Sequence, residues 1–191
     1  VVMRSDNSFP DVLLRMTEDA EKTCPFLTDR GCSVYSDRPH TCRLFPLEQG
    51  VLCDALKGET PAIVHFFRAP RFCLGRHREK TWTPETWRQD QEADFYSLVT
   101  ALWAEMRWLF REDAWGEGGF GSPKAKMAFM ASYNVDRFRE FVLQSSFLGR
   151  FRVEPTLLQK LETDDVELMF FGWDWVRWYL WRTPSQRFGL A

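Results

Sequence analysis

CPFLTDRGCSVYSDRPHTCRLFP, residues 24–46, is the stretch that decides how the first part of this chain folds. It holds Cys24, Cys32 and Cys42, which are separated by turn signals such as Thr28-Asp29-Arg30-Gly31. Tight turns of this kind fold the thiols back toward one another. Thiolates suit zinc, Fe–S clusters and Cu(I), and four-sulfur sites are a common outcome. We therefore expect a loop-rich segment that is arranged around a metal site.

A later cysteine, Cys73, supplies a fourth candidate ligand. Gly75 follows it, and a small residue there lets the backbone approach a metal and donate N–H bonds to sulfur. The strong zinc signal, a CxxC pair, is missing, so the spacing leaves open that the cysteines are reduced core residues. Five cysteines cannot form a fully paired disulfide framework within one chain, and we expect the fifth, Cys53, in the core.

Composition and charge narrow the class of protein. The 191 residues are 45% hydrophobic and 27% charged, which is ordinary for a globular protein, and the net charge of −2 gives no basic face for nucleic acid. No apolar run is long enough for a transmembrane segment, and residues 1–10 lack the apolar core of a signal peptide. We expect a cytoplasmic protein with reduced thiols, and an unknown protein partner stays open.

The composition and the hydrophobic periodicity of the chain change near residue 80, although we expect residues 1–191 to form a single domain. Residues 1–80 are rich in Pro, Gly, Asp and Cys and form the loop-rich cysteine lobe, with strands expected only at 12–16 and 63–67. Residues 81–191 form the helical lobe, because their apolar residues recur at three- and four-residue steps. The predicted fold class is mainly α, with few or no strands and about four helices, at 83–111, 134–146, 154–161 and 163–181. A Gly-rich segment, 115–122, is expected to be a flexible loop.

The central stretch also resembles a known family. Its CPFL block, its Cys-Ser-Val-Tyr segment, its Arg-Pro-x-x-Cys-Arg-x-Phe-Pro segment and the later Cys73-Leu74-Gly75 are similar to the CxxCxxCC cysteine-cluster family, the YkgJ-like zinc- or iron-chelating domains. The downstream helices resemble the tails of longer bacterial members. The family's CxxCxxCC run precedes its CPFL block, but no Cys precedes Cys24 here. The resemblance implies metal or Fe–S binding, without an established reaction to carry over.

Five charged or titratable residues near the cysteines have two interpretations each. Arg38 and Arg43 lower the pKa of thiolates and screen a bound cluster, or they pair with a carboxylate such as Asp29 or Asp37. The histidines are candidate nitrogen ligands or, as we favour, hydrogen-bonded or surface residues, with His65 satisfied on a strand; the three are His40, His65 and His77.

The chain ends in a Trp-rich helix that favours core packing over a membrane surface or a docking face. No catalytic triad or Glu-x-x-His pattern is present, which leaves open whether the protein is an enzyme. The favoured function is binding of iron or an Fe–S cluster by Cys24, Cys32, Cys42 and Cys73, with Arg38 and Arg43 beside the cofactor. The alternatives are a structural zinc protein and an interaction module that uses its aromatic helix.

Overall fold

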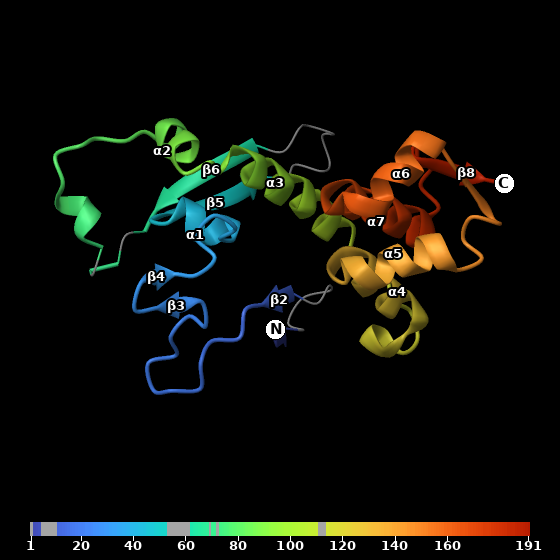
Figure 1. Ribbon diagram of the computed structural model, residues 1–191, viewed down its shortest axis with the longest axis horizontal. Coiled ribbons are helices and arrows are strands. Elements are labelled where there is room, and N and C mark those ends of the chain that lie inside the picture. Colours follow the sequence, from blue (N-terminus) through green and yellow to red (C-terminus); the bar gives the residue numbers. More distant parts are fainter. Residues whose placement is uncertain (1, 5–10, 53–61, 69, 72, 111–113) are drawn as a thin grey trace. The chain divides into compact units, whose positions relative to one another are not determined.

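The computed structural model describes residues 2–4, 11–52, 62–68, 70–71, 73–110 and 114–191, and the fold within them is mainly α, as the sequence predicts (Figure 1). The helices are α1 (His40–Leu44), α2 (Pro84–Asp90), α3 (Asp94–Leu109), α4 (Pro123–Tyr133), α5 (Val135–Gln144), α6 (Pro155–Thr163) and α7 (Asp165–Trp181). Short 3-10 helices cover Leu74–His77 and Gly119–Gly121. None of the helices in these ranges is long and apolar enough to cross a bilayer.

The strands are short and form four two-stranded antiparallel sheets within the described ranges. The pairs are β1 (Val2–Arg4) with β2 (Asp11–Leu13), β3 (Leu27–Thr28) with β4 (Gly31–Cys32), β5 (Leu47–Leu52) with β6 (Ala62–Phe67), and β7 (Phe151–Val153) with β8 (Phe188–Leu190). The strand expected at 63–67 is confirmed as β6, whereas the one expected at 12–16 ends at Leu13. The sequence did not predict β5, the partner of β6, because Gly50 interrupts the apolar pattern of residues 47–52.

The chain divides into two compact units. We call residues Leu14–Leu109 the cysteine unit; residues Val1–Leu13 and Phe110–Ala191 form the helical unit. In the cysteine unit, β5 and β6 pair over their whole length, from Leu47 opposite Phe67 to Leu52 opposite Ala62. Helices α1 and α3 both pack against β5, and α2 contacts α1. These contacts hold α1, which carries one of the cysteines.

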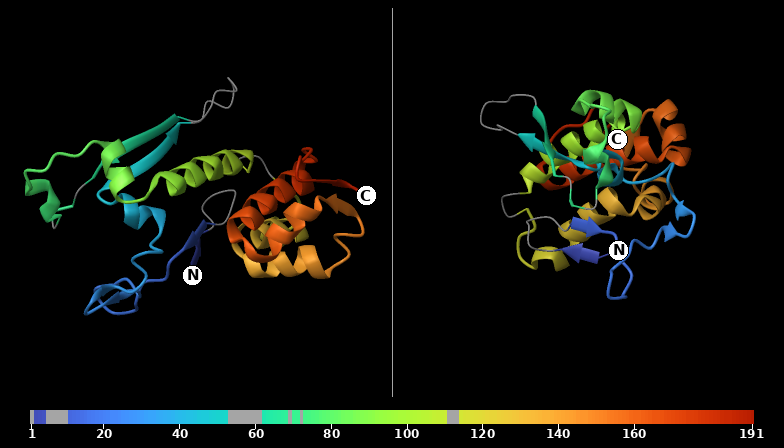
Figure 2. Two further views of the ribbon diagram at one scale, coloured as in Figure 1. Left: turned by 45° about the horizontal axis from the view of Figure 1, so that its top comes forward. Right: turned by 90° about the vertical axis from the view of Figure 1, so that its left-hand side faces the viewer.

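In the helical unit, α4, α5 and α7 pack against one another, and Figure 2 shows them side by side from two further directions. The core is aromatic: the Phe147 ring lies 4.8 Å from the Phe151 ring and 5.0 Å from Trp175, measured between centroids. Trp173 and Trp175 are only 6% and 4% exposed, so the expectation that the Trp-rich helix packs in a core is confirmed. Asp164 accepts N–H bonds from Val166 and Glu167 and caps α7 as predicted.

Two helix expectations were wrong. The single helix expected over 83–111 begins as predicted, with Thr83 as N-cap and Pro84 in the first turn, but it ends at Asp90 and restarts at Asp94. Helix α4 was not predicted at all, and the 3-10 turn Gly119–Gly121 lies within the segment expected to be a flexible loop. Ser122 followed by Pro123 is the start signal for α4, since the Ser122 Oγ accepts from the Ala125 N–H.

Candidate metal centre

A tight hairpin carries the first two cysteines. Leu27 pairs with Cys32 and Thr28 with Gly31, so Asp29 and Arg30 form the turn. Gly31 has φ of +101°, a left-handed conformation that disfavours a side chain, which explains the glycine directly before Cys32. Cys24 is tied to the base of the hairpin, because its carbonyl accepts from the Leu27 N–H at 3.0 Å. The turn chemistry therefore places Cys24 and Cys32 at the same end of one small loop.

The third cysteine, Cys42, lies on the one-and-a-half-turn helix α1. Partial burial raises the pKa of the Cys42 thiol above its ordinary value, and the charges of the Cys24 and Cys32 thiols raise this pKa further, while Arg38 lowers it. Coulombic effects of this kind fall off with distance, so Cys24 and Cys32 each lie within electrostatic range of Cys42. All three are free thiols, and both Cys32 and Cys42 are exposed.

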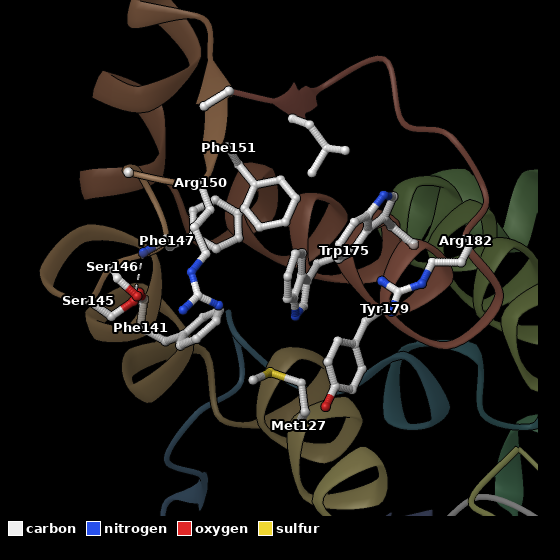
Figure 3. A pocket seen from close by; sticks show the side chains of 14 residues that line it. Met127, Phe141, Ser145, Ser146, Phe147, Arg150, Phe151, Trp175, Tyr179 and Arg182 are labelled. Atoms are coloured by element: carbon white, nitrogen blue, oxygen red, sulfur yellow. Dashed lines mark hydrogen bonds between the residues drawn. The ribbon is translucent and has the colours of Figure 1, made fainter.

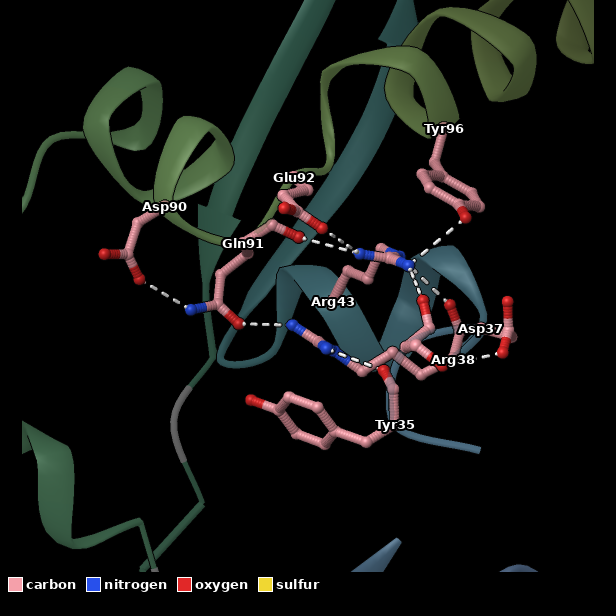
Figure 4. Close-up of polar contacts among 9 residues, drawn as sticks. Tyr35, Asp37, Arg38, Arg43, Asp90, Gln91, Glu92 and Tyr96 are labelled. Atoms are coloured by element: carbon pink, nitrogen blue, oxygen red, sulfur yellow. Dashed lines mark hydrogen bonds and ion pairs between the residues drawn. The ribbon is translucent and has the colours of Figure 1, made fainter. Parts of the chain in front are cut away.

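Arg38 and Arg43 are buried, and they connect the segment around α1 with the end of α2 and the start of α3 (Figure 4). Arg43 is only 3% exposed and donates to the Arg38 and Gln91 carbonyls, at 3.1 Å each, and to the Ser36 carbonyl. It also donates to the Tyr96 hydroxyl at 3.2 Å. A buried guanidinium needs most of its five N–H donors satisfied, and the loop carbonyls supply that. Arg43 therefore joins the backbone before α1 to Gln91 at the end of α2 and to Tyr96 on α3.

Arg38 makes a similar set of contacts. It donates to the Tyr35 carbonyl at 2.8 Å and to the side-chain oxygen of Gln91 at 2.9 Å, and it lies 4.0 Å from the Tyr35 ring centroid. Within the described segment 11–52, neither arginine forms an ion pair with Asp29 or Asp37. Arg43 instead lies 3.7 Å from the carboxylate of Glu92. The carboxylate-pairing interpretation thus holds only for Arg43, and with a different partner.

The arginines also explain why the predicted long helix is broken. Gln91 caps α2, Glu92 takes a left-handed φ of 51°, and the Ala93 N–H donates back to the Arg88 carbonyl at 2.8 Å. This is a Schellman ending, in which glycine normally holds the left-handed position. The break frees the Gln91 carbonyl for Arg43. Because Glu stands where Gly is usual, the sequence pattern gave no stop signal.

His40 joins α1 to α3. Its Nε2 lies 3.1 Å from the Ser97 Oγ and its Nδ1 lies 3.0 Å from the Thr100 Oγ1. Burial lowers the pKa of His40 to about 4, with a further contribution from the nearby charge of His65. The expectation of a hydrogen-bonded histidine is confirmed here. His65 lies on β6 as expected, but its buried Nε2 has no hydrogen-bond partner among the described residues, so the expectation that it is satisfied was wrong.

Cys73 lies in different surroundings from the other three cysteines. It precedes the 3-10 helix Leu74–His77 and lines a recess whose apolar walls include Phe45, Trp82 and Trp87. A Cβ added at Gly75 would lie 3.8 Å from the Cys73 Sγ, so the glycine backbone does run beside this sulfur. The recess adjoins the end of α1, because the Trp87 indole donates to the Leu44 carbonyl at 2.9 Å.

Within the described residues, no three His, Cys, Asp or Glu side chains are grouped closely enough to hold a metal ion. Cys24, Cys32 and Cys42 are brought near one another without being gathered into such a group. His77 is exposed on its 3-10 helix. Cys53 lies outside the described residues. The donor set nevertheless fits a thiophilic metal in its chemistry, since it offers free sulfur ligands on one short segment.

The mainly α chain thus carries a cysteine unit in which Cys24, Cys32 and Cys42 are free thiols on one short segment. Residues 3–86 match the family model CxxCxxCC, described as "Putative zinc- or iron-chelating domain". This matched segment holds all four candidate cysteines and confirms the resemblance read from the sequence over these residues. The match ends at residue 86, so the likeness of the later helices to longer members stays a prediction. No curated protein and no solved structure matches the chain.

Proposed function

We propose that the cysteine unit binds iron, as an ion or an Fe–S cluster, through the thiolates of Cys24, Cys32 and Cys42, with Cys73 as the fourth ligand. The observation that supports this most is the set of three free thiols on one short segment; burial raises the pKa of Cys42, and the charges of Cys24 and Cys32 raise it further. Thiols that repel one another's charge on a short loop gain free energy when a cation neutralises them. The family match, described as zinc- or iron-chelating, supports the same class of ligand.

The loop that bears the thiols is held at its ends rather than along its length. Arg38 and Arg43 fix residues 35–43, whereas the β3–β4 hairpin is exposed and tied mainly by its own turn bonds, such as Thr28 Oγ1 to the Gly31 carbonyl at 2.9 Å. Such a hairpin can adjust toward α1 at a small cost, since few contacts have to break. Metal sites are rarely preformed before the metal binds, so the spread of the thiols fits this proposal.

The arginines have a defined part in this proposal. The charge of Arg38 opposes part of the rise in the pKa of Cys42, so Arg38 favours the thiolate that a metal needs. An iron centre held by thiolates supplies electron transfer, whereas zinc in the same place is redox-silent and structural. We place iron first and structural zinc second, and we propose a cytoplasmic, reducing location, in which the thiols stay available.

The test is metal content and a visible spectrum on the full chain purified without oxygen. Iron with acid-labile sulfide, or iron alone, supports the proposal, and one colourless zinc per chain supports the second candidate. The triple variant Cys24→Ser, Cys32→Ser, Cys42→Ser should lose the metal, and Cys73→Ser should weaken its retention. Cys53→Ser is the matched control and should keep full metal content. Full metal content in the triple variant would contradict the proposal.

A further inference from the structure

The helical unit contains a recess of about 720 Å³ beside α7 (Figure 3). Aromatic side chains form most of its wall: Phe141, Phe147, Phe151, Trp175, Trp178 and Tyr179. The rings of Trp175 and Trp178 are stacked with centroids 5.1 Å apart, and Phe151 stands edge-on to Trp178 at 4.8 Å. Walls built from packed aromatic rings favour a flat apolar body, because such a body makes close contact with ring edges and faces that line the recess.

Two guanidinium groups complete the lining of this recess. Arg150 and Arg182 both border it, and no Asp or Glu side chain is among the described residues that line it. Arg182 lies over the Trp178 ring, 4.5 Å from its centroid. Within the described part of the chain, Arg150 forms hydrogen bonds through its backbone alone, so its guanidinium is available to a ligand. Both charged side chains that line the recess are therefore cationic, which favours an anion.

A third polar group is buried and unpaired. The Nε1 of Trp175 is shielded from solvent and has no hydrogen-bond partner among the described residues, although Trp175 is only 4% exposed. In Figure 3 the indole nitrogen of Trp175 points into the space between Arg150 and Tyr179. Buried N–H donors are nearly always paired, and leaving one unpaired destabilises the fold. An acceptor oxygen on a bound ligand would satisfy it.

We propose that this recess binds a small planar aromatic carboxylate. The aromatic body lies in the recess at the edge of the Trp175 ring, and the carboxylate accepts from Arg150 and the Trp175 indole N–H, with Arg182 adding positive charge. The donor pair fits a carboxylate because one oxygen can face the guanidinium while the other faces the indole. This inference is independent of the metal proposed for the cysteine unit, since every lining residue belongs to the helical unit.

The test uses 2-naphthoate as probe and its amide, 2-naphthamide, as the uncharged comparison. Indole N–H signals of the full-length 15N-labelled chain are followed by NMR, and Trp175→Phe identifies the Trp175 signal by its loss. We expect 2-naphthoate to shift the Trp175 signal with a dissociation constant below about 1 mM, and the amide to bind about tenfold more weakly. No shift of this signal, or equal binding of acid and amide, would overturn the proposal.

A charge variant provides the second arm. Arg150→Gln should weaken 2-naphthoate binding about tenfold and leave binding of the amide nearly unchanged, because only the charged contact is lost. Arg152→Gln removes an exposed arginine two residues along that does not line the recess, and it should bind as the wild type does. Equal loss in both variants, or no loss in Arg150→Gln, would contradict the assignment. If Arg150→Gln does not fold, the comparison of acid and amide on the wild type decides.

Discussion

The two units are held together by different means. Among the residues that the structure describes, most buried apolar side chains lie in the helical unit, whereas the cysteine unit contributes Leu44, Ala93, Ala101 and Met106. The cysteine unit instead buries Arg38, Arg43 and Ser97, and it exposes many large apolar side chains. A small apolar core contributes little hydrophobic free energy. The helical unit is thus stabilised mainly by packing of aromatic rings, and the cysteine unit by specific polar contacts. We infer that a bound metal contributes further stability to the cysteine unit.

The largest effect should come from the metal. If thiolate coordination contributes folding free energy, adding the metal under anaerobic conditions should stabilise the cysteine unit by several kcal/mol, less than the roughly 10 kcal/mol or more of structural zinc sites. Hydrogen exchange of the full chain should slow in peptides from residues 24–44 and stay unchanged in α5 and α7. Equal slowing in both units would show that their stability is not divided as we infer. The Cys24, Cys32, Cys42 triple Ser variant is the control and should show no slowing.

The polar anchoring of the cysteine unit can be broken at Arg43. Arg43→Met keeps much of the side-chain volume but leaves three carbonyl groups without their donor. We expect the free energy of unfolding of the cysteine unit to fall by about 3 kcal/mol, because buried acceptors lose their partners. Hydrogen exchange in α1 and α3 measures this loss.

Arg68→Met is the matched control for that experiment. Arg68 lies in the same unit, but its side chain is 74% exposed and its ion pair with Glu48 spans 3.5 Å. Exposed pairs contribute little, so this change should cost well under about 1 kcal/mol. Similar losses in the two variants would contradict the view that buried polar contacts hold the unit.

The ring-packed unit can be tested at the crossing of α4 and α7. A Cβ added at Gly172 would lie 2.3 Å from the Ala131 carbonyl oxygen, which belongs to a backbone that cannot rotate away. Gly172→Ala should therefore destabilise the helical unit by about 2 kcal/mol, through overpacking. Denaturant unfolding followed by hydrogen exchange in α4 and α7 measures it. Gly189→Ala, where an added Cβ meets nothing within 4 Å, should cost much less, and an equal cost would show that the crossing tolerates a side chain.

The same crossing shows why part of the fold escaped sequence reasoning. Helix α4 turns Ala125, Ala128 and Ala131 inward, so its buried face is built from small residues and carries no strong apolar stripe. Its partner on α7 is Gly172, far along the chain. Amphipathic patterns predict α5, α6 and α7 well because their large apolar residues recur on one face. Close packing of small residues depends on a neighbouring helix that a local pattern does not reveal.

The candidate site divides in a similar way. Three of the four candidate cysteines, the turn between the first two and most of the family resemblance can be read from residues 24–46, because they are local. The partners of the arginines cannot, since Gln91 and Tyr96 lie 48 and 53 residues after Arg43. Arg43 was noticed for its place beside Cys42, but its contacts join α1 to the break between α2 and α3. Long-range polar contacts of buried residues have no signature in the spacing of the chain.

The last effect we expect is a pH dependence in which His40 of the cysteine unit takes part. His40 has a pKa of about 4 in the folded chain, against an ordinary value of 6.5. Above pH 6.5 it is neutral in both states; between 6.5 and 4 the unfolded chain binds a proton that the folded chain does not. The free energy of unfolding of the cysteine unit should therefore fall as the pH is lowered through that window, because up to about one proton is taken up on unfolding. His65, whose pKa is also lowered by burial, adds a further contribution.

His40→Gln should flatten this dependence in α1 and α3, measured by hydrogen exchange at each pH. His77→Gln changes an exposed histidine and should leave the dependence as in the wild type. An equally steep dependence in His40→Gln would show that the buried, neutral His40 is not what makes this unit sensitive to acid.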